Sequence, residues 1–140
     1  VLTFLQDRDD VKADEIGAVA FADVAPAVLH AAAFEQQIRW LVLVESLLDY
    51  QGVVMHPLYD VNANSLVAGA LSAYDLPDLL ASIAPRRVAL LQPTTHLGTA
   101  AARDQITSSL GFVERHSQDK LRIETQGTDL KQLIEWCVQP

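Results

Sequence analysis

The side chains best placed for chemistry in this sequence are His96, Glu45 and Asp49. His96 follows the apolar segment 87–92, whereas Glu45 and Asp49 follow the apolar segment 38–44. If both segments are parallel strands, these residues lie at the carboxyl edge of the sheet, where ligands bind in open α/β folds. One hypothesis is therefore a carboxylate–histidine cluster, and the alternative is a solvated polar rim.

The other three histidines have weaker functional signals. His30 lies in an alanine-rich segment with no acidic residue four positions away, which favours a satisfied or surface imidazole. His56 could contact a partner, and His116 fits a helix end, where it can interact with the last carbonyl groups.

Nothing in the sequence indicates a metal ion or a cofactor. No His-x-His or His-x-x-x-His spacing occurs, and Cys137 is the only cysteine, so neither an internal disulfide nor a thiolate metal site can form. Arg86 and Arg87 lack the glycine-rich loop of a phosphate site. We expect both to pair with acidic residues at the amino edge of the sheet.

Apolar periodicity and turn residues predict an α/β fold, with a mostly parallel sheet and helices on both faces. Strands are predicted at 15–21, 38–44, 87–92 and 121–125, and helices at Val24–Phe34, Asp75–Ala84, Thr99–Arg115 and Leu130–Val138, after the end of a helix at Val1–Asp7. Asp75 and Asp78 fit a helix N-cap and its first turn. Tyr50–Leu71 is predicted to be an irregular excursion, and such long loops are usually functional.

Length and composition favour one domain over residues 1–140 and argue against two classes of partner. The net charge of −8 would repel a phosphate backbone, so nucleic acid is not expected. No apolar stretch approaches the ~20 residues of a membrane span. The compartment stays open.

The segment Tyr74–Pro93 resembles the "DLPDLxAxxAPRPxLLxNP" stretch of the α/β-hydrolase superfamily, specifically its dienelactone-hydrolase-like and acetyl-xylan-esterase-like bacterial esterases. Val67–Leu71 is similar to the family's "VPGxL", and Asp14–Gly17 is similar to its "DRIG". The resemblance implies that this chain is the C-terminal half of an eight-stranded fold, without the first four strands.

The resemblance also implies where a catalytic triad would lie. The nucleophile elbow G-x-S-x-G corresponds to residues 20–24, with Ala22 at the serine position. The acid position corresponds to Thr95 and the histidine position to Thr128. None of the three side chains can fill its role.

These observations favour a catalytically inactive α/β-hydrolase-like domain, a scaffold or interaction module of a larger protein. The alternatives are an active carboxylic-ester hydrolase, with His96, Glu45 or Asp49 in a residual site, and a small-molecule binding domain that uses the old substrate crevice. Ile16–Phe21 would be an uncharged edge strand, which invites pairing. We therefore expect a homo-oligomer, or pairing of this strand with an N-terminal half.

Overall fold

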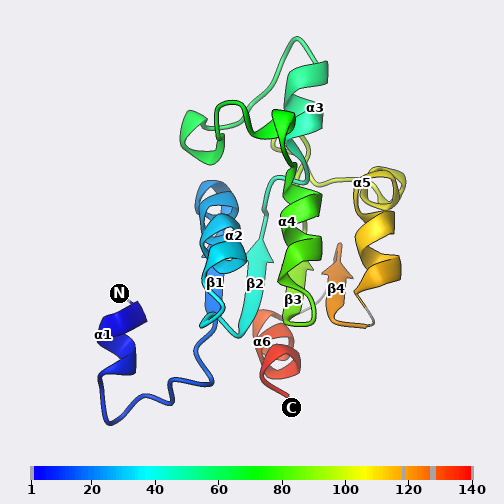
Figure 1. Ribbon diagram of the computed structural model, residues 1–140. Helices are drawn as coiled ribbons and strands as arrows, with labels where there is room; N and C mark the ends of the chain where they lie inside the picture. Colours follow the sequence, from blue (N-terminus) through cyan, green and yellow to red (C-terminus); the bar gives the residue numbers. More distant parts are fainter. Residues whose placement is uncertain (1, 118, 127–128, 140) are drawn as a thin grey trace.

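A four-stranded parallel sheet forms the centre of the structure, a computed structural model that describes residues 2–117, 119–126 and 129–139. Its strands are β1 (Ala18–Phe21), β2 (Trp40–Val44), β3 (Arg87–Leu91) and β4 (Leu121–Glu124). They lie in the order β1-β2-β3-β4, and every neighbouring pair is parallel. The predicted α/β class and parallel topology are therefore confirmed, with each strand shorter than predicted (Figure 1).

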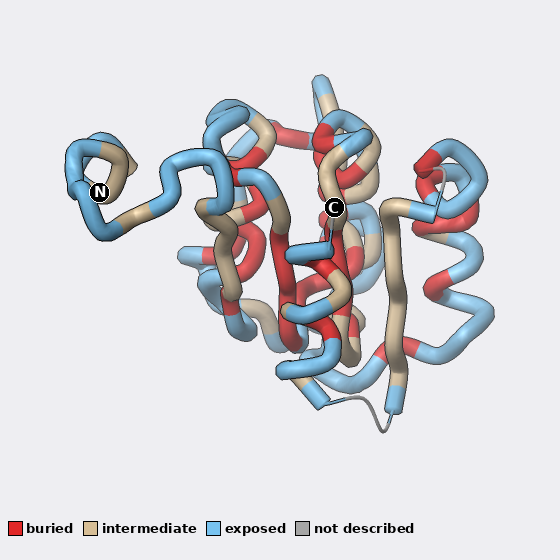
Figure 2. The backbone as a smooth tube through the Cα atoms, turned by 90° about the horizontal axis from the view of Figure 1, so that it is seen from below, coloured by how far each residue is buried: buried red, intermediate tan, exposed pale blue. Residues whose placement is uncertain are grey.

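Helices cover both faces of this sheet. The larger core packs α2 (Ala25–Phe34), α4 (Leu76–Ile83) and α5 (Arg103–His116) against side chains such as Leu41 and Leu43. The smaller core places α6 (Leu130–Val138) against the alternate side chains, among them Val42 and Ala89. Because both faces are covered, β2 is buried at four of its five positions, and buried residues gather on the central strands (Figure 2).

Two predicted boundaries were wrong. The helix expected from Thr99 begins at Arg103, because residues 99–101 fold back on the preceding loop, where the Ala101 amide donates to the Pro93 carbonyl at 2.8 Å. The excursion is partly regular: it opens with α3 (Tyr50–Met55) and holds two short 3₁₀ turns, Ala63–Ser65 and Ala70–Ser72. A short helix, α1 (Leu2–Gln6), lies at the end of an arm that leads to β1, and its Leu2 packs against the larger core (Figure 1).

Two arginines at the amino edge of the sheet donate to main-chain carbonyls. Arg86 donates to the main-chain carbonyls of Ala32 at 2.7 Å and Ile38 at 2.8 Å. Arg87 donates to the Trp136 carbonyl, with its guanidinium 5.2 Å from the Trp136 ring centroid. The expectation that Arg86 pairs with an acid is therefore wrong among the described residues, because main-chain carbonyls left without a partner near the end of α2 accept from its guanidinium group.

Among the described residues, no single helix is long and apolar enough to cross a membrane. The segments Ala63–Ser72 and Leu76–Ile83 reach that length and composition only together, and they are bent by 85° relative to each other.

The Asp75 carboxylate caps two helices at once. It accepts the Leu76 amide at 2.6 Å as the N-cap of α4, and it also accepts the amides of Tyr50 at 2.7 Å and Gln51 at 3.0 Å, at the start of α3. Asp78 completes a capping box by accepting the Asp75 amide at 2.8 Å. The predicted N-cap is therefore confirmed, and it also fixes the excursion to the core.

Replacing Asp75 should therefore destabilise the fold more than replacing an ordinary cap. We expect Asp75→Ala to lower the free energy of unfolding by about 2 kcal/mol, and Asp129→Ala, which removes the cap of α6 alone, by about 1 kcal/mol. Urea denaturation followed by circular dichroism measures both values. Equal losses would contradict a shared cap.

Candidate functional site

Three successive strands end in the same unusual backbone conformation at the carboxyl edge. Ala22, Glu45 and Gln92 directly follow β1, β2 and β3, and their φ angles are 46°, 53° and 51°. The last residues of the three strands are in register, so these positions lie side by side. Positive φ is costly for residues with a Cβ and is typical of tight functional turns. We therefore infer that the candidate site lies at the carboxyl edge of the sheet, at this row of three residues.

A small cavity, here called the β1 cavity, lies at this row. Its volume is about 120 Å³, and its lining includes Ala22, Asp23, Glu45, Asp60, Ser65 and Thr95. The hydroxyl of Ser65 donates to the Asp23 carbonyl at 3.0 Å, which ties the excursion to the turn after β1. The cavity thus combines carboxylates with the hydroxyl groups of Ser65, Thr94 and Thr95, and none of the described residues that line it is a histidine.

The excursion is held over this cavity by Tyr50. Its hydroxyl donates to the Ser65 carbonyl at 2.9 Å. Burial, with smaller contributions from Tyr74 and Asp75, raises the pKa of Tyr50 to about 12, so the phenol stays protonated and keeps donating.

A larger cavity, here called the α5 cavity, lies between α3, the loop after β3 and α5. Its volume of about 370 Å³ is within the range of small-molecule sites. Its lining includes Asp49, His56, Thr95, His96, Gln105, Ser108 and Ser109. Asp49 is the N-cap of α3: it accepts the Gly52 amide at 2.7 Å and the Ser109 hydroxyl. The two imidazoles are stacked, with ring centroids 3.9 Å apart.

The two cavities divide the residues predicted from sequence. Ala22 and Glu45 line the β1 cavity, Asp49 and His96 line the α5 cavity, and Thr95 lines both. The hypothetical cluster of His96 with both carboxylates is therefore only partly formed, because Glu45 faces the other cavity. Thr128, the remaining triad position, lies outside the described residues.

Sequence reasoning did not place several of the lining residues in the site. Ser109 joins the site from α5, sixty positions from its partner Asp49. Asp60 and His56 come from the excursion, where no periodicity predicts their direction. Gln105 and Ser108 or Ser109 are spaced three and four residues apart, which puts them on one polar helix face. This spacing is the signal in the sequence that could have identified a polar face on α5. It does not identify Asp49 as the residue that this face contacts.

The other two histidines have structural partners. His30 bonds to the Pro26 carbonyl at 2.7 Å and to the Tyr74 hydroxyl at 3.0 Å. His116 bonds to the Phe112 carbonyl at 2.8 Å, as expected for a helix end. Cys137, on α6, is buried against the sheet, and this burial raises the pKa of its thiol to about 11.

Metal-ligand geometry is also missing from the described part of the chain, where no three His, Cys, Asp or Glu side chains converge. No protein-family model and no curated protein matches this sequence.

The positive φ at Ala22 gives a stability test of the row. Ala22→Gly should raise the free energy of unfolding by about 1 kcal/mol, because glycine adopts this conformation without a Cβ penalty. Ala31→Gly, at an exposed helical position in α2, should lower it by about 1 kcal/mol. Urea titrations would report both changes. A loss in both variants would show that the turn at Ala22 carries no strain.

Proposed function

We propose that this chain is a non-catalytic domain of the α/β-hydrolase type, which acts as a scaffold or interaction module within a larger protein. The observation that carries the proposal is the turn after β1. A strand leads through a residue of positive φ into a helix, as a nucleophile elbow requires, but that residue is Ala22. The backbone conformation of the turn therefore resembles an elbow, but its side chain is a methyl group without a nucleophilic oxygen.

The polar groups around the turn support the same proposal. Within the described residues, no histidine hydrogen bonds to a serine, threonine or cysteine side chain. Ser65 donates to a main-chain carbonyl, and Ser109 donates to Asp49. An acyl-transfer site needs an imidazole in contact with its nucleophile, because the hydroxyl is a weak nucleophile without a base. Thr95, at the acid position, cannot orient such a base.

A second candidate function is small-molecule binding without turnover. It is favoured by the α5 cavity, whose volume of about 370 Å³ and mixed polar lining would accommodate a ligand. An active esterase is the third possibility, and it would need a nucleophile other than residue 22.

Activity-based labelling separates these functions. The chain should show neither fluorophosphonate labelling nor hydrolysis of short-chain esters above background, and Ala22→Ser should gain neither, because serine alone restores no base. Ser109→Ala is the matched control, since it removes the cavity serine that contacts a carboxylate. Labelling of the unmodified chain that Ser109→Ala abolishes would establish the esterase instead.

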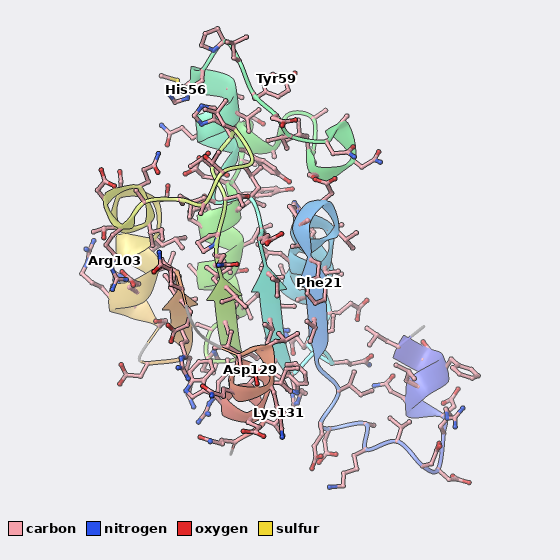
Figure 3. The ribbon with its side chains drawn as sticks, turned by 180° about the vertical axis from the view of Figure 1, so that it is seen from behind. Phe21, His56, Tyr59, Arg103, Asp129 and Lys131 are labelled. Carbon is pink, nitrogen blue, oxygen red and sulfur yellow. The ribbon has the colours of Figure 1, made fainter. Side chains whose placement is uncertain are left out.

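An interaction module needs an interaction surface, and β1 offers one. The outer edge of β1 pairs with no strand among the described residues, and Ile16–Ala22 carries no charge. Phe21 is 53% exposed and lies away from α6 (Figure 3). An uncharged edge of this kind promotes pairing. We propose that it pairs with its own copy or with preceding residues of the parent protein.

Sedimentation at micromolar concentration tests the pairing with a second copy. We expect a dimer that Phe21→Lys converts to a monomer, because a charge at an edge strand opposes pairing. Phe112→Lys changes a comparably exposed ring on α5 and should leave the dimer intact. A stable monomer of the unmodified chain, with this strand exposed to solvent, would contradict both forms of pairing.

A further inference from the structure

The α5 cavity contains a feature that hydrolase-type chemistry does not use: two stacked imidazoles. His56 ends α3, and His96 lies in the loop after β3. Their planes differ by 11°, and their centroids are 3.9 Å apart. Figure 3 shows His56 and Tyr59 at the opposite end of the molecule from α6. The stack therefore joins the start of the excursion to the sheet's carboxyl edge.

The excursion has one further tie to this loop, since the Asp60 amide donates to the His96 carbonyl at 2.8 Å. Tyr50 and Val53 anchor the beginning of α3 in the larger core, but the segment 54–60 that follows is exposed, with Met55 at 70% and Leu58 at 76%. With few buried side chains in the segment, the ring stack is a large share of what holds it.

The stack has a defined protonation pattern. His56 Nδ1 lies 2.7 Å from the Gly52 carbonyl, which can only accept, so this nitrogen carries a proton. His56 Nε2 and both ring nitrogens of His96 have no hydrogen bond partner among the described residues. The parallel planes also prevent both rings from directing lone pairs at one metal ion, since those lone pairs lie in the ring planes.

Only one charged side chain faces the stack across the cavity. Asp49, the N-cap of α3, is the one carboxylate among the described residues that line the α5 cavity, so its charge can offset one positive charge there. From α5 come Gln105, Ser108 and Ser109, which are uncharged. Asp60, from the excursion, and Glu45, after β2, line the β1 cavity instead. A second proton would therefore meet a like charge without a second carboxylate to offset it.

We propose that the His56–His96 stack is a pH-sensitive latch, which holds the start of the excursion against the loop after β3 and releases it when both rings are protonated. Histidine side chains as a class titrate near pH 6.5, so release belongs to mildly acidic conditions. Two unit charges about 4 Å apart shift the closed-to-open ratio about fivefold toward the open form in bulk water, and more where protein surrounds them. Release would remove one wall of the α5 cavity.

Amide hydrogen exchange tests the latch, with protection factors corrected for the intrinsic effect of pH. Between pH 7.5 and pH 5.0, the protection of the Asp60 amide should fall at least about fivefold, while amides of β2 stay protected. His56→Phe keeps a ring that cannot be charged, so the fall should disappear. His116→Phe, which changes a distant histidine, should retain it. An unchanged Asp60 amide in the unmodified chain, or an undiminished fall in His56→Phe, would overturn the proposal.

A proton NMR titration of the unmodified chain gives an independent answer if His56→Phe does not fold. The Cε1 protons of the two rings should titrate in two separated steps, because the first charge opposes the second. Superimposable single-site curves for both rings would also overturn the latch.

Discussion

The arrangement of the carboxyl edge depends on the Asp75 carboxylate. By accepting amides from the first turns of both α3 and α4, it fixes the excursion to a helix of the main core. Tyr50, whose amide is one of these donors, then extends its hydroxyl to Ser65 and sets the excursion over the turn after β1. This half-buried carboxylate thus positions α3, which lines the α5 cavity, and the Tyr50 hydroxyl, which bonds to a residue that lines the β1 cavity.

The two edges of the sheet, at the amino and carboxyl ends of its strands, differ in hydrogen bonding and in backbone conformation. At the amino edge, helix carbonyls are satisfied by the guanidinium of Arg86, and this group's burial and the charge of Arg39 both lower the pKa of Arg86. At the carboxyl edge, the chain turns sharply three times through positive φ at non-glycine residues. Three residues with strained backbone thus lie at the edge of the sheet where α/β folds place their ligands. At the opposite edge, the hydrogen bonds of Arg86 satisfy main-chain carbonyl groups.

This distribution bears on the proposed relationship to hydrolases. The turn at Ala22 has the backbone conformation that the proposal compares with a nucleophile elbow, but Glu45 and Gln92 share this positive φ after the next two strands. The polar side chains that the fold does bring together are carboxylates and stacked imidazoles, not a nucleophile with a base. Such an arrangement suits binding and response to protons better than acyl transfer.

The sequence by itself determined the fold class, because the periods of apolar residues at 38–44 and 87–92 and the capping residues at Asp75 and Asp78 are local signals. It also determined that residue 22 has no nucleophile. Tertiary structure alone decided which side chains meet: Ser109 with Asp49, His56 with His96, and Arg86 with helix carbonyls instead of acids. These contacts join segments far apart in the chain, and their partners are selected by packing geometry, for which no local pattern exists.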